Sequence, residues 1–149
     1  MDASAYAAAL RTQLDRASGA AEEKLARIVA AVPDAAEELQ LLVFPDQDGE
    51  GGFSIVATLE GPDSYVLNRA IEDDRTLFEV VHGAQGPTPP VPMFAPGRAG
   101  FEVRDAIVDA ASGWLEELWE RAARGRSPVP GYIAGIDGWG TVDPVELEA

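Results

Sequence analysis

The stretch from Phe101 to Arg124 constrains the fold most, because it carries the strongest helical periodicity in the sequence. Its apolar side chains recur at steps of three and four residues, and further apolar side chains widen the stripe: Val103, Ile107, Ala111, Trp114, Leu118 and Ala122, with Val108, Leu115 and Trp119. Acidic residues lie toward its start, and Arg121 and Arg124 lie near its end, which complements a helix dipole. The stretch therefore predicts a helix that buries a broad face in the core.

A second long stripe runs from Ala3 to Val32, with apolar residues again at steps of three and four: Tyr6, Leu10, Leu14, Ala17, Ala21, Leu25, Ile28 and Val32. The stripe stays in phase across Ser18-Gly19, so we expect one helix, bent at this pair, that Pro33 ends. Packing into the core is the first interpretation of the stripe. Pairing with a second copy, giving a homodimer, is the alternative.

Alternating patterns between these helices predict a β-hairpin, with strands at 38–44 and 53–59 joined by an acidic loop at 45–52. Asp63 or Ser64 can cap a short helix that follows. Residues 77–82 read as a third strand, and 91–94 as a short extended piece that proline restricts to an edge or loop.

The irregular segment 127–149 is too apolar for a free tail, and we expect it to pack back on the body as a hairpin turning near Asp137-Gly138. The chain shows no internal repeat and no linker between domains. We therefore predict a single α+β domain over residues 1–149, with a small antiparallel sheet packed against two long helices in one layer each.

The charge balance limits the partners that the chain can bind. It has 26 acidic and 11 basic residues and a net charge of −15. Nucleic acid and anionic membrane surfaces are thus poor partners, whereas a basic protein fits. The acidic N-terminus does not read as a secretion signal, so we expect a cytoplasmic location.

Catalytic and cofactor motifs are weak in this sequence, so no cofactor is expected. Asp46, Asp48 and Glu50 match the first half of a calcium loop, but Ala57 stands where the bidentate glutamate belongs. The chain has no cysteine, and His82 is its one histidine, which disfavours zinc. A cation- or ligand-binding loop and a carboxylate-based enzyme remain the two alternatives to a binding protein.

Acidic residues concentrate on the predicted hairpin and on the tail after Arg126, two regions that contain no lysine or arginine. If the two regions lie side by side, they form one negative face with interleaved aromatic residues. Our leading hypothesis is a non-enzymatic domain that binds a basic protein there. The candidate contact residues are Asp46, Asp48, Glu50, Phe53, Asp137 and Trp139.

In size, charge and texture the chain resembles the small acidic α/β proteins of GC-rich bacteria. Some families of that description are immunity proteins that neutralise a basic toxin. This resemblance implies a protein-binding role and carries over no residue roles, because no diagnostic motif is shared.

Overall fold

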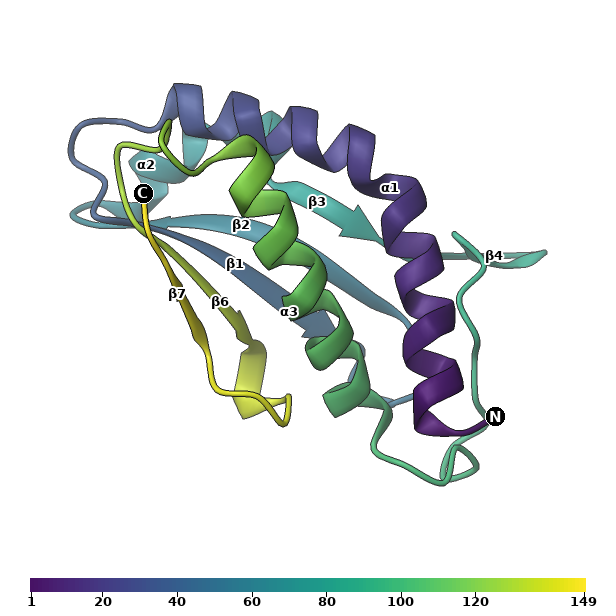
Figure 1. Cartoon of the computed structure of the whole chain (residues 1–149). Coiled ribbons are helices and arrows are strands. Elements are labelled where there is room, and N and C mark those ends of the chain that lie inside the picture. Colours follow the sequence, from purple (N-terminus) through teal and green to yellow (C-terminus); the bar gives the residue numbers. More distant parts are fainter.

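Helices and a sheet form two layers, with the long helices α1 and α3 on one face of a five-stranded sheet (Figure 1). The computed structural model describes residues 1–149. Its elements follow the order α1 Ala3–Ala31, β1 Glu38–Pro45, β2 Phe53–Glu60, α2 Ser64–Arg69, η1 Glu72–Asp74, β3 Thr76–Glu79, β4 Val81–Gly83, β5 Gly86–Thr88, α3 Val103–Ala122, β6 Gly131–Gly135, η2 Ile136–Gly138 and β7 Val145–Leu147.

Helix α1 is one continuous helix, as predicted, and it bends near its middle (Figure 1). The Ser18 hydroxyl donates to the Leu14 carbonyl at 3.3 Å, inside the helical hydrogen-bond ladder. Such a bond beside Gly19 is a usual cause of a helix bend. Ser18 also accepts a 2.8 Å hydrogen bond from the Trp114 indole, so the bend lies where α3 packs against α1.

The predicted stripe of α3 is confirmed, since all nine of its apolar side chains are buried. Glu102 caps the helix at its start, and Arg121 lies in its last turn. At the border between the two long helices, Arg11 pairs with Glu117 and Arg121 pairs with Glu22. The core therefore lies between these helices and the inner face of the sheet.

The predicted hairpin is confirmed in its register, with Leu39 opposite Leu59 and Val43 opposite Ile55. Burial alternates along both strands, so that one side chain faces the helices and the next faces outward. The tail is also confirmed as a hairpin, in which β6 and β7 pair in an antiparallel manner.

The prediction of an antiparallel sheet was wrong, because the sheet is mixed. The strand order is β3-β2-β1-β6-β7, and β6 runs parallel to β1. Helices α1 and α3 end at the same end of the sheet, and each is followed by a strand that runs back beneath it (Figure 1). Two strands that start from the same end and lie side by side are necessarily parallel.

The predicted short helix is confirmed as α2, a third α-helix besides the two long ones, and its predicted cap Asp63 accepts from Val66 N–H at 3.4 Å. The third strand ends at Glu79, and the chain continues into a small separate hairpin formed by β4 and β5. Residues 91–94 form no strand and lie in a loop, one of the two places to which proline was expected to restrict them.

Glycines on β6 let α3 lie close to the sheet. A Cβ atom added to Gly131 would lie 2.7 Å from the ring of Trp119, and one added to Gly135 would lie 2.6 Å from Val108. The Trp119 indole donates a 2.7 Å hydrogen bond to the Glu148 carbonyl, which fastens the last residues to α3.

Candidate binding surface

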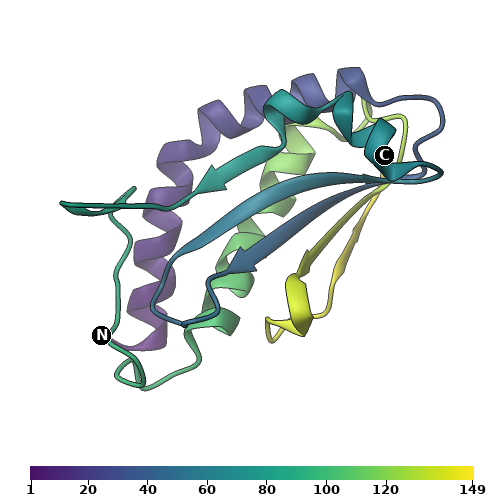
Figure 2. The ribbon, with the colours of Figure 1, turned by 180° about the vertical axis from the view of Figure 1, so that it is seen from behind.

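The outer face of the sheet has neither long helix on it, and Figure 2 shows it with α1 and α3 behind. Strand pairing places Val56, Leu42 and Ala134 in one row across β2, β1 and β6. Phe44 and Tyr132 occupy neighbouring rows of the same face. All five side chains are half-buried, so the centre of this face is apolar.

Carboxylates surround this apolar centre. Glu60 lies opposite Glu38 at one end of the hairpin, Glu146 lies on β7 beside Tyr132, and Glu79 lies on β3 opposite Ser54. Glu60, Glu79 and Glu146 are exposed, and none of the four carboxylates forms an ion pair. We call the apolar centre and these four glutamates the outer sheet face.

The tip of the hairpin spreads its acidic side chains apart. Asp46 lies 3.3 Å from His82 on β4, and Asp48 accepts a 2.9 Å hydrogen bond from the Glu50 backbone N–H. No group of three or more histidine, aspartate and glutamate side chains in the chain is arranged to hold a metal ion. Asp48 is thus engaged with its own loop, as in an ordinary turn.

Arg104 connects the hairpin tip to the tail. Its guanidinium lies 4.0 Å from the centre of the Trp139 ring and donates a 3.0 Å hydrogen bond to the Gln47 carbonyl. A hydrogen bond from Arg104 to Glu102 holds the pKa of that carboxyl below its usual value. The tip and the η2 turn therefore meet at one end of the sheet, with a cation between them.

The six candidate contact residues take different positions. Asp48 and Asp137 are exposed, and Trp139 is half-buried under Arg104. Phe53 was proposed as a contact residue but lies beneath the surface, since it is 2% exposed and stacks on Phe78 with ring centres 5.0 Å apart. Its position opposite Pro45, at the start of the inward alternation of β2, is the signal that predicts burial.

A shared acid and base pair for catalysis is not evident near the third strand. The cavity between α1 and β3, about 650 Å³ in volume, holds Glu79 as its one carboxylate. The carboxylates of the hairpin tip do not line this cavity, and Asp46 lies beside His82 instead.

Comparisons with known proteins identify a family and give no function. The model of a family of unknown function, DUF6389, matches residues 1–149, which is the whole chain. No curated protein and no solved structure matches the chain. None of the helices combines the length and apolar character that a membrane span requires.

Proposed function

We propose that this chain, which belongs to the DUF6389 family, is a non-enzymatic domain that binds a basic protein through its outer sheet face. One observation carries the proposal: an apolar centre lies on a sheet face that has no long helix on it, inside a ring of four glutamates without ion-pair partners. An apolar centre with a polar rim is the usual anatomy of a protein interface.

The charge of the whole chain supports a basic partner. A net charge of −15 attracts a cationic protein over long distances and speeds its encounter. The rim carboxylates can then pair with lysine or arginine side chains, while Leu42, Phe44 and Val56 supply the apolar contact. A basic toxin that this chain neutralises by binding fits this description, and the resemblance to immunity proteins agrees with it.

Affinity capture from cell extract at low and high salt tests this function. We expect a stoichiometric basic protein at low salt and its loss at high salt, because salt screens exposed charges. The variant Glu79→Lys/Glu146→Lys reverses two exposed charges of the outer sheet face and should abolish capture. The control Glu23→Lys/Glu116→Lys changes the net charge equally on exposed positions of α1 and α3, and should capture the partner normally.

Two results would count against the proposal. Equal loss in both double variants would show that only net charge matters, and capture of no basic protein would remove the proposed role.

A third variant, Asp46→Lys/Asp48→Lys/Glu50→Lys, tests whether the hairpin tip extends the interface. A calcium-binding loop would instead raise the melting temperature in millimolar calcium, and Asp48→Ala would remove that rise.

A further inference from the structure

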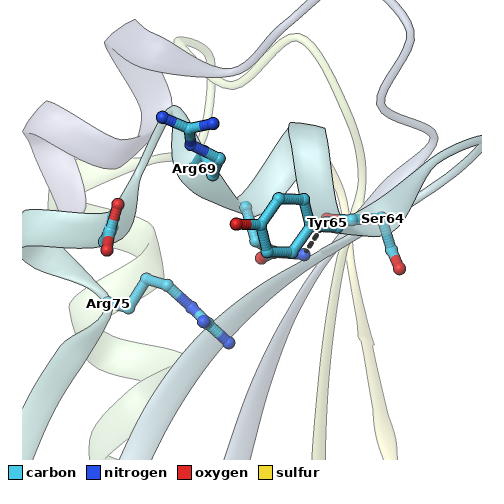
Figure 3. A pocket seen from close by; sticks show the side chains of 6 residues that line it. Ser64, Tyr65, Arg69 and Arg75 are labelled. Carbon is cyan, nitrogen blue, oxygen red and sulfur yellow. Dashed lines mark hydrogen bonds between the residues drawn. The ribbon is translucent and has the colours of Figure 1, made fainter.

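A polar cavity of about 560 Å³ lies between α2, η1 and the adjacent edge of the sheet. It is lined by Ser64, Tyr65, Asn68, Arg69, Glu72 and Arg75. In Figure 3 the Tyr65 ring is seen between Arg69 and Arg75. Two of the eleven basic side chains of this acidic chain therefore line one cavity.

The Arg75 guanidinium is fixed by hydrogen bonds, and no carboxylate neutralises its charge. Its Nε donates a 3.0 Å hydrogen bond to the Ala57 carbonyl, and its Nη2 donates a 2.9 Å bond to the Thr58 hydroxyl. Neither acceptor is a carboxylate, and Nη1 keeps both of its N–H groups free. A fixed guanidinium with free donors is well suited to an anionic oxygen.

Arg69 is likewise unneutralised, since it forms no ion pair and its side chain donates no hydrogen bond. Its guanidinium lies 6.0 Å from the centre of the Tyr65 ring. Five other arginines of the chain do pair with carboxylates: Arg11, Arg27, Arg104, Arg121 and Arg124. Arg16, Arg98 and Arg126 also form no ion pair, so Arg69 and Arg75 are distinguished by lining the same cavity.

The walls of the cavity are well fixed. The Asn68 amide accepts from Leu59 N–H at 2.9 Å and donates to the Leu59 carbonyl at 3.0 Å and the Ser64 carbonyl at 2.8 Å. Asn68 thus joins α2 to the end of β2 and sets the separation of Arg69 and Arg75. Tyr65 as a whole residue is 73% exposed, so its aromatic ring is open to solvent.

We propose that this cavity binds a small molecule that carries a phosphate or carboxylate group next to a flat ring. Arg69 and Arg75 bind the anionic group, and Tyr65 stacks against the ring. Glu72 lies at the same cavity and opposes the anion by its own negative charge. This site borders the outer sheet face at Thr58, to which Arg75 donates, but its ligand does not depend on a protein partner.

Titrations followed by amide NMR shifts test the site, with phenyl phosphate and benzoate as probes and phenol as the neutral reference. We expect saturable shifts confined to residues 64–75 for at least one anion and none for phenol. The tighter of the two anions identifies the natural group as phosphate or carboxylate. Arg69→Ala should weaken binding about tenfold, as loss of a charge-assisted hydrogen bond does.

Three matched variants distinguish binding of the anion at this cavity from nonspecific attraction of the anion to any arginine. Glu72→Gln should tighten binding several-fold, because it removes a like charge, whereas Arg98→Ala, an exposed and unpaired arginine elsewhere, should leave it unchanged. Arg75→Lys should weaken it, because lysine cannot hold the Ala57 carbonyl and the anion together. Absence of saturable binding by both anions, or equal weakening by Arg98→Ala and Arg69→Ala, would overturn the proposal.

Discussion

Replacing Gly131 with alanine tests how closely α3 packs on β6. The new Cβ would lie 2.7, 2.9 and 3.0 Å from the Cη2, Cζ3 and Cζ2 atoms of Trp119. The indole has no room to retreat, because it is fully buried and its Nε1 is fixed to the Glu148 carbonyl. The change therefore forces two well-packed elements apart.

The size of the effect follows from two opposing terms. Overpacking in a core costs about 1–3 kcal/mol, and the fixed ring places this site at the upper end. Alanine in an unstrained position gives back about 0.4–1 kcal/mol by restricting the unfolded chain. We expect a net loss of about 2 kcal/mol in the free energy of unfolding, measured by urea denaturation followed by circular dichroism.

A second change, Trp119→Phe, tests whether the contact with the Trp119 ring causes this loss of stability. Phenylalanine lacks the three crowded indole atoms, so Gly131→Ala should cost almost nothing in that background, a coupling of about 2 kcal/mol. The control Gly113→Ala lies in α3 with no heavy atom within 4 Å of the added Cβ, and should stabilise by about 1 kcal/mol. An equal cost of Gly131→Ala in both backgrounds would refute the proposed contact.

Three other predictions follow from single side chains. Tyr6→Phe should raise stability by about 1 kcal/mol in thermal unfolding, because the buried Tyr6 hydroxyl has no hydrogen-bond partner. Asn68→Ala should lower it by about 1–2 kcal/mol, because both backbone groups of Leu59 lose their partner. The pKa of Glu102 in the folded chain lies below the usual 4.5. Its ionised carboxylate therefore stabilises the fold above that pH, and this stabilisation is lost as the pH falls. Urea midpoints of Glu102→Gln and the parent chain should thus differ at neutral pH and converge in acid.

The helices and the hairpin were predictable because their signals are local. In α3 the apolar stripe marks every buried position except Ser112, and in the hairpin the alternation separates the residues of the two faces. The single continuous α1 was predictable for the same reason, since the stripe stays in phase through Ser18-Gly19.

The sheet order and the site were less predictable because they depend on contacts between distant segments. The residues of segment 131–135 carry no local signal that predicts pairing with β1 or its parallel direction. The alternation of the hairpin places Leu42 and Phe44 on one face of β1, but which face lies away from both long helices depends on the topology. The cavity of Arg69 and Arg75 was missed because Asn68, which positions it, resembles any polar residue of a short helix.

The parallel pairing of β1 with β6 has a consequence for synthesis of the chain. Leu39 meets its partner Gly131 only after the whole segment between them has been synthesised. At typical translation rates the delay is roughly 5–18 s, during which one edge of β1 has no neighbour. Open strand edges are places where nascent chains associate wrongly, so the ribosome-bound intermediate is the stage at which this protein most needs a chaperone.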